Sequence, residues 1–127
     1  MAALEEILRL GSAKILNIKV QRVGGLAPAR AMYHRAARAG MDCWMGTMPE
    51  LGIASAQALH LATLPGFTYP TDVEASRRWF HDDIIEPLLE IDRDGYLNIP
   101  AGAGSRWRVD RRKLERYTVA RERVRRF

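Results

Sequence analysis

A chain of 127 residues that is 47% hydrophobic and 28% charged has the size and composition of one folded domain, which excludes bulk disorder. The N-terminus is acidic where a signal peptide would be basic, and no apolar run approaches the length that spans a membrane, so we expect a cytoplasmic protein without membrane contact. The net charge of +5 comes from the tail, because residues 106–127 carry ten Lys or Arg against three Asp or Glu.

The predicted elements begin with a helix and a strand. Residues 2–10 place aliphatic side chains at helical spacing and stop at Gly11. Residues 13–20 then form an apolar run with β-branched residues, which is typical of a buried strand. A double glycine makes the next turn, and an alanine-rich helix is predicted over 29–40.

The same order is repeated further along the chain. Residues 41–46 are a short apolar run, and residues 50–64 have the small-residue pattern of a helix that packs closely on a sheet. Residues 66–70 are expected to begin a third strand, with a helix opening at Val73. Because parallel neighbours need a connection long enough to hold a helix, this order predicts an α/β fold with a parallel sheet.

The end of the chain has a different character. After position 92 the sequence contains a turn at Asp94-Gly95, a loop rich in glycine and alanine, and the basic tail. We expect an irregular extension here and not another strand-helix unit. The predicted organisation is therefore a strand-and-helix part over 1–92 and a C-terminal extension over 93–127.

The cysteine and the histidines offer little for metal or nucleophilic chemistry. Cys43 has no neighbouring cysteine or histidine at ligand spacing, so we expect a buried thiol and no zinc site. His34, His60 and His81 lie on predicted helices without mutual spacing, and each is expected to be structural or exposed.

Lys19 stands where the first predicted strand gives way to a turn. Ligands of parallel sheets bind at the carboxyl ends of the strands, where a desolvated lysine can act as an acid or a base. The alternative is a strand-end lysine whose amine simply extends to water. The position of Lys19 leaves both interpretations open.

Three segments carry a resemblance to a known family in their order and spacing: "NIKVQRVGG" from position 17, "GTMPELGIASAQALHLATLPGFTYPTDVEASRRWFHDDIIEP" from position 46, and "DGYLNIPAGAG" from position 94. The chain resembles the C-terminal third of an enolase-superfamily enzyme of the muconate-lactonizing subgroup, closest to o-succinylbenzoate synthase and the N-acylamino acid racemases. This resemblance implies a partial (β/α) barrel, made of the last three units (strands six to eight) and the C-terminal extension.

The resemblance also implies site residues. Lys19 matches the sixth-strand lysine, which in the racemases is one of two acid/base lysines on opposite faces of the substrate and in the synthases helps to stabilise the enolate. Four further residues match positions that border the substrate: Gly46, Met48, Glu50 and Asp72. Plainer interpretations of the two acids are a helix N-terminal charge for Glu50 and a turn residue for Asp72.

Some residues near these positions depart from the family pattern. Thr47 and Thr71 replace glycines, and we expect them to add bulk beside the substrate pocket. Arg22, which matches the turn after Lys19, is expected to have mainly a structural, salt-bridging role. The "GTMPE" turn at positions 46–50 also resembles that of muconate cycloisomerases.

The family's chemistry needs parts that these 127 residues do not match. It removes the proton α to the carboxylate of a small substrate and stabilises the enediolate on Mg²⁺, which acidic residues of strands three to five hold. A second-strand lysine pair and an N-terminal capping domain are also unmatched, and a full barrel needs about 250 residues. The resemblance therefore implies a fragment that is inactive by itself.

Two other functions remain open. One is a non-catalytic interaction module that pairs through its unpaired sheet edges, either with another copy or with a missing N-terminal portion. The other is nucleic-acid binding through the basic tail, which is less favoured because Glu115 and Glu122 interrupt the positive charge.

Overall fold

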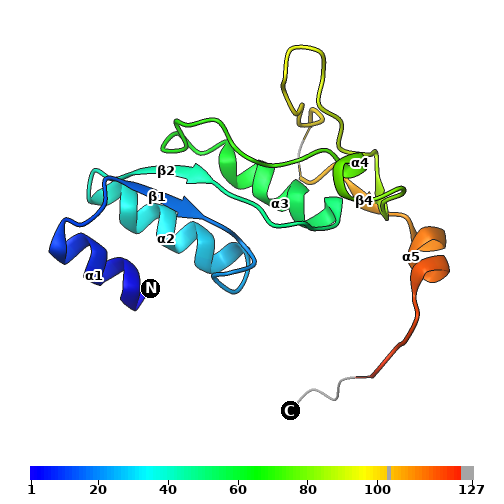
Figure 1. Ribbon diagram of the computed structural model, residues 1–127, viewed down its shortest axis with the longest axis horizontal. Helices are drawn as coiled ribbons and strands as arrows, with labels where there is room; N and C mark the ends of the chain where they lie inside the picture. The colour runs from blue at the N-terminus through cyan, green and yellow to red at the C-terminus, as the bar shows by residue number, and fades with distance from the viewer. Residues whose placement is uncertain (103, 124–127) are drawn as a thin grey trace.

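The computed structural model describes residues 1–102 and 104–123. Helices and short strands alternate over the first half of the chain, as the sequence predicts, and Figure 1 shows their arrangement. In chain order the elements are α1 (Ala2–Leu10), β1 (Ile15–Ile18), α2 (Leu26–Arg38), β2 (Asp42–Met45), α3 (Gly52–Ala62), α4 (Ser76–Trp79), β3 (Ile85–Glu86), β4 (Arg108–Val109) and α5 (Arg111–Tyr117).

β1 and β2 form a parallel pair in register from Ile15 opposite Asp42 to Ile18 opposite Met45. α2 makes the crossover between them, and α1 and α2 lie on the same side of the pair in Figure 1. Ile18 and Met45 are completely buried on the helix-covered face. This face is the main hydrophobic core, to which α2 and α3 contribute small residues that allow close packing on the strands.

The other face of the two strands remains largely open. Ile15 is 40% exposed, whereas Ile18 is fully buried, because successive side chains of a strand point to opposite faces. Asn17 and Asp42 are also exposed on this side. The strand pair therefore has a packed face and an uncovered one.

The predicted third strand over 66–70 is wrong as an extended element. It is reduced to a single parallel bridge between Cys43 and Phe67, in which the Cys43 N–H donates to the Gly66 carbonyl at 3.0 Å. Pro65 and Pro70 bracket this segment, and proline has no N–H to offer a ladder. The bridge still keeps the segment beside β2.

The helix predicted from Val73 begins later and is short. The Val73 N–H is bound by the hydroxyl of Thr71 at 3.1 Å, and the N-cap residue Ala75 has an extended backbone. Helical structure starts at Ser76, whose N–H donates to the Leu89 carbonyl at 3.0 Å. One local and one longer-range hydrogen bond thus hold the segment before α4 in an extended form.

The C-terminal extension is more ordered than the sequence suggests. β4 pairs antiparallel with β3, and Trp107 is 4% exposed, with its ring edge-on to that of His60 at 5.4 Å. Asp110 caps α5 by accepting from the N–H groups of Arg112 and Lys113. The expectation of an irregular extension is therefore wrong for this part, while the domain boundary after position 92 stays a prediction.

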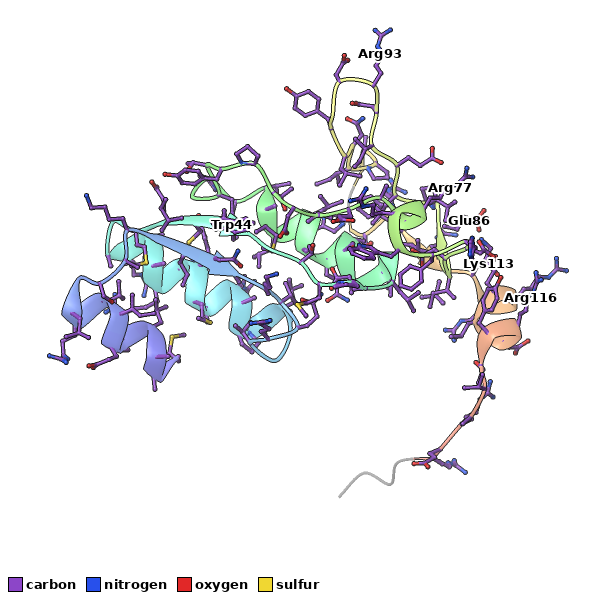
Figure 2. All side chains as sticks on the ribbon, viewed as in Figure 1. Trp44, Arg77, Glu86, Arg93, Lys113 and Arg116 are labelled. Atoms are coloured by element: carbon purple, nitrogen blue, oxygen red, sulfur yellow. The ribbon has the colours of Figure 1, made fainter. Side chains whose placement is uncertain are left out.

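A cluster of side chains fastens α5 to the body of the protein. The Lys113 amine donates to the Asp82 carboxylate at 2.5 Å and to the Asp83 carbonyl at 3.1 Å, and the Tyr117 hydroxyl donates to Asp82 at 3.1 Å. The bond from Lys113 lowers the pKa of Asp82 below its ordinary value. In Figure 2 Lys113 lies with Arg116 at the end of the molecule opposite α1. Within the described residues, no helix is long and apolar enough to cross a membrane.

Candidate functional site

Lys19 follows β1 directly, at the carboxyl end of the parallel pair. The chain turns away at once, because the Arg22 N–H donates to the Lys19 carbonyl at 3.0 Å and the Gly25 N–H donates to the Val20 carbonyl at 2.9 Å. Gly25 has a φ of 115°, a left-handed conformation that glycine adopts without steric strain. The tight turn leaves the half-buried Lys19 side chain at the strand end.

The Lys19 amine donates a hydrogen bond to the main-chain carbonyl of Thr47. Thr47 follows the end of β2, so the contact joins the carboxyl ends of two neighbouring strands. The lysine amine therefore has a direction set by the protein and does not simply extend into water.

Thr47 is also bound to Asp72. The Thr47 N–H donates to Oδ1 of Asp72 at 2.6 Å, and the Thr47 hydroxyl donates to the Asp72 main-chain oxygen at 2.9 Å. The Asp72 N–H lies 3.4 Å from the Met45 carbonyl, to which it donates. Asp72 is therefore held at the end of β2, although it comes from a segment about 25 positions further along.

Glu50 lies in the same neighbourhood. Its Oε1 accepts from the Ser55 hydroxyl at 3.1 Å, while Oε2 is buried without a hydrogen-bond partner in the described part of the chain. The pKa of Glu50 is raised above its ordinary value, mainly because burial disfavours the charged carboxylate. The negative charge of Asp72 also raises this pKa, whereas the hydrogen bond from Ser55 and the positive charge of Lys19 lower it. Glu50 also lies only three positions after Thr47, the residue that contacts both Lys19 and Asp72.

Gly46 and Met48 border this region from the turn after β2. The Gly46 N–H donates to the Ile18 carbonyl at 3.0 Å, and a Cβ at Gly46 would collide with the side-chain amide of Asn17. Met48 is 36% exposed at the surface. Lys19 and Asp72 are therefore joined through Thr47, and Gly46, Met48 and Glu50 lie in the segment between β2 and α3 that contains Thr47.

The two threonines make hydrogen bonds that the sequence does not predict, and the expectation for Arg22 needs correction. Thr47 is 8% exposed and bound to Asp72, and the Thr71 hydroxyl donates to the Met45 carbonyl at 2.7 Å, while their added bulk beside a substrate pocket stays a prediction. Arg22 is exposed, and no salt bridge joins it to another described residue. Main-chain hydrogen bonds hold its turn instead.

Sequence reasoning missed the role of the two threonines. The only signal in the sequence was that these threonines replace glycines of the family pattern. They do so next to a strand end, where a hydroxyl can form hydrogen bonds with main-chain groups. The buried thiol of Cys43, in contrast, is as predicted: the side chain is inaccessible, and burial, assisted by the charge of Asp42, raises its pKa to about 11.

The acids of the site do not form a metal site by themselves. Residues 1–102 and 104–123 contain no group of three His, Cys, Asp or Glu side chains that could hold a metal. Asp72 is engaged by Thr47, and Glu50 by Ser55. The Mg²⁺ that the resemblance implies therefore does not fit a site made by these residues.

The arrangement can supply one clear chemical function. A half-buried amine that is directed by a carbonyl can stabilise a developing negative charge or exchange a proton with a bound molecule. Its place at the carboxyl ends of parallel strands is where ligands of such sheets bind.

Comparisons with known proteins show the family of the chain. The family model described as enolase C-terminal domain-like matches residues 1–113. The chain is 41% identical over 111 residues to o-succinylbenzoate synthase of Geobacillus stearothermophilus, a match that covers 87% of this chain and 29% of that protein. It is 42% identical over 97 residues to N-succinylamino acid racemase of Thermus thermophilus, covering 76% of this chain and 26% of that protein.

A solved structure extends the likeness to the fold. The probable mandelate racemase from Alicyclobacillus acidocaldarius matches with a TM-score of 0.82 and 35% identity, covering 92% of this chain and 31% of that one. The chain thus spans less than a third of the relatives that it matches. The predicted partial barrel and the predicted family are both confirmed. With a family model that covers residues 1–113, the chain belongs to the enolase C-terminal domain-like family.

Proposed function

We propose that this chain provides strands six to eight of the catalytic barrel of an enzyme resembling o-succinylbenzoate synthase and the N-acylamino acid racemases, and that Lys19 is its catalytic lysine. The complete enzyme would remove the α-proton of a small carboxylate substrate and form an enediolate, in the cytoplasm. The observation that supports the proposal best is the hydrogen bond from the Lys19 amine to the Thr47 carbonyl, which directs the amine at the strand ends.

The residues of the site have separate roles in this proposal. The Lys19 amine stabilises negative charge on the reacting substrate when protonated, and takes up or returns a proton on one face of the substrate in a racemisation. Glu50 and Asp72 accept hydrogen bonds from the substrate. Gly46 and Met48 form the wall of the site beside β2.

Part of the machinery must come from outside these residues. When bound, the Mg²⁺ implied by the family stabilises charge on the substrate carboxylate, but its ligands are not among the described residues. The base that opposes Lys19 must also come from another polypeptide segment. We therefore propose that the chain does not catalyse by itself and requires a missing N-terminal portion.

Reconstitution tests this function. The chain would be co-expressed with the N-terminal portion of the Geobacillus stearothermophilus o-succinylbenzoate synthase, and dehydration and racemisation would be measured with Mg²⁺ present. We expect both activities to require both pieces. Lys19→Ala should lower turnover at least ~10²-fold, the lower range for a positioned acid or base, with KM changed less.

Two further variants make the test specific. Lys19→Arg keeps the positive charge but cannot act as a base near neutral pH, so it should keep some dehydration and lose racemisation that starts from the Lys19 face. Lys14→Ala changes an exposed lysine just before β1 and should leave turnover unchanged. An active reconstituted enzyme whose turnover is unaffected by Lys19→Ala would show that Lys19 is only a strand-end lysine.

A non-catalytic interaction module is the second candidate function. It is favoured by the open side of the strand pair, where Ile15 is 40% exposed, and it requires no reaction at Lys19. If the two pieces bind one another but remain inactive with succinylbenzoate precursors, N-acylamino acids and muconate, this second function is the better description. If the joined pieces instead act on muconate and on neither of the other substrates, the enzyme is better described as similar to the muconate cycloisomerases.

A further inference from the structure

Thr47 is the residue at which Lys19 and Asp72 meet. Its carbonyl accepts from the Lys19 amine, and its N–H and hydroxyl donate to the Oδ1 and the main-chain oxygen of Asp72, at 2.6 and 2.9 Å. These bonds form one chain, from the lysine after β1, through the turn after β2, to the segment before α4. Thr47 occupies its centre.

The hydroxyl of Thr47 matters because the residue is buried. Only 8% of Thr47 is exposed, so water cannot readily replace a bond that its hydroxyl loses. With its N–H and hydroxyl both attached to Asp72, the residue is anchored at two points. Two anchors leave little freedom to rotate the following peptide group, whose carbonyl receives the Lys19 amine.

Simple attachment of the Asp72 segment does not account for this arrangement. The segment is already joined to β2 by the Thr71 hydroxyl, which donates to the Met45 carbonyl at 2.7 Å, and by the Asp72 N–H, which donates to the same oxygen at 3.4 Å. Thr47 adds a contact that these bonds do not make, namely the one to Lys19.

We propose that Thr47 is a positioning residue, whose hydroxyl bond to Asp72 aligns the carbonyl that holds the Lys19 amine. The catalytic meaning of this role rests on the proposed function of Lys19. The positioning itself is a property of this chain and can be measured without any activity.

Competitive acetylation of the lysines tests the proposal in the full chain. The sequence has three lysines, Lys14, Lys19 and Lys113, and the exposed Lys14 is an internal reference. Limited acetylation of the native protein with acetic anhydride would be followed by mass spectrometry. We expect Thr47→Val to raise the Lys19-to-Lys14 labelling ratio about threefold to tenfold, as the loss of one ordinary hydrogen bond would do.

Conservative and matched variants separate positioning from general destabilisation. Thr47→Ser keeps the hydroxyl and should return the ratio to the wild-type value, and Thr47→Gly, which the family pattern tolerates, should behave like Thr47→Val. Thr63→Val is the control, because the Thr63 hydroxyl makes only a local bond to the His60 carbonyl at 2.8 Å. It should leave the ratio unchanged.

Three outcomes would overturn the proposal. The first is a Lys19-to-Lys14 labelling ratio that is unchanged in both Thr47→Val and Thr47→Gly, and the second is a raised ratio that Thr47→Ser does not return to the wild-type value. The third is an equal rise in the Lys113-to-Lys14 labelling ratio. The last result would mean that the hydroxyl supports the whole fold. An inactive reconstituted enzyme would contradict the proposed function but would not alter these labelling ratios, so the two proposals fail separately.

Discussion

The buried carboxylate of Asp83 accepts a hydrogen bond from the main-chain N–H of Gly52 at 2.8 Å, across 31 positions of the sequence. Gly52 is the first residue of α3, and the N-cap residue Leu51 provides no side-chain cap. Asp83 therefore supplies from a distance the cap that the local sequence lacks, and its charge lies at the favourable end of the helix.

Removing this cap should destabilise the fold. Asp83→Ala leaves the Gly52 N–H buried without a partner, and we expect it to lower the free energy of unfolding by about 1–3 kcal/mol. Asp83→Asn retains an acceptor oxygen and should lower it less. Urea denaturation followed by circular dichroism measures both, and an Asp83→Ala midpoint equal to that of the wild type would contradict the capping role.

Gly46, at the site, and Gly52, at the start of α3, should respond differently to alanine. A Cβ at Gly52 would lie 2.6 Å from Cγ2 of Ile85 and 2.7 Å from Oδ2 of Asp83, both of which belong to buried residues, so Gly52→Ala should cost about 1–3 kcal/mol of stability. A Cβ at Gly46 would meet the end of the exposed Asn17 side chain, which can rotate away. Thermal denaturation should rank Gly46→Ala as the milder change; the reverse order would show that the Gly46 turn is the tighter one.

Cys43 should make stability fall at alkaline pH. Its pKa is raised from an ordinary 9.0 to about 11. Between these two pH values the thiol is ionised in the unfolded chain and neutral in the folded one, which favours unfolding. The contribution of the thiol to the free energy of unfolding is therefore complete below pH 9.0 and is lost as the pH rises toward about 11. The midpoint of urea denaturation, measured across this range, should decline less in Cys43→Ala than in the wild type. If the denaturation midpoints of the two proteins change with pH in parallel, the thiol does not contribute to the pH dependence of stability.

The open side of the strand pair should cause self-association of the isolated chain. Exposed apolar surface and an unpaired strand edge both favour contact with another chain. Ile15 is 40% exposed at the start of β1, so Ile15→Lys should shift the sedimentation profile toward monomer. A compact wild-type monomer that melts cooperatively would contradict this expectation.

Magnesium should have little effect on the isolated chain. The described residues offer no group of three ligand side chains, and one oxygen of each acid near Lys19 already accepts a hydrogen bond. Calorimetric titration should therefore show only weak binding, similar to that of any acidic surface, and chelation with EDTA should leave the melting temperature unchanged. A tight stoichiometric site would require ligands that the resemblance does not assign to this chain.

Local pattern was sufficient to predict much of the fold and the site. The order of helices and strands follows from hydrophobic periodicity, and the place of Lys19 follows from the rule that the ends of parallel strands meet at one edge. Glu50 and Asp72 could be placed only through their resemblance to known motifs. The structure then placed Asp72 against Thr47, the residue that the Lys19 amine contacts.

What local pattern could not predict depends on contacts between distant positions. The extended backbone at Val73 is held by bonds from Thr71 and the neighbouring strand end, and these overcome the local tendency to begin a helix. The order of the extension depends likewise on the burial of Trp107 against α3 and on the bonds from Lys113 to residues about 30 positions earlier. Single-sequence reasoning has no access to such pairs.

The attachment of α5 also determines how the molecule would respond to a pulling force. A load applied at the C-terminus reaches the amine of Lys113 and its contacts with Asp82 and Asp83 before it reaches the parallel strands. The next resistance is the two-residue antiparallel pairing of β3 with β4. Because Asp83 also caps α3, tension at the tail would be transmitted to the helix that follows the Lys19 and Thr47 contact.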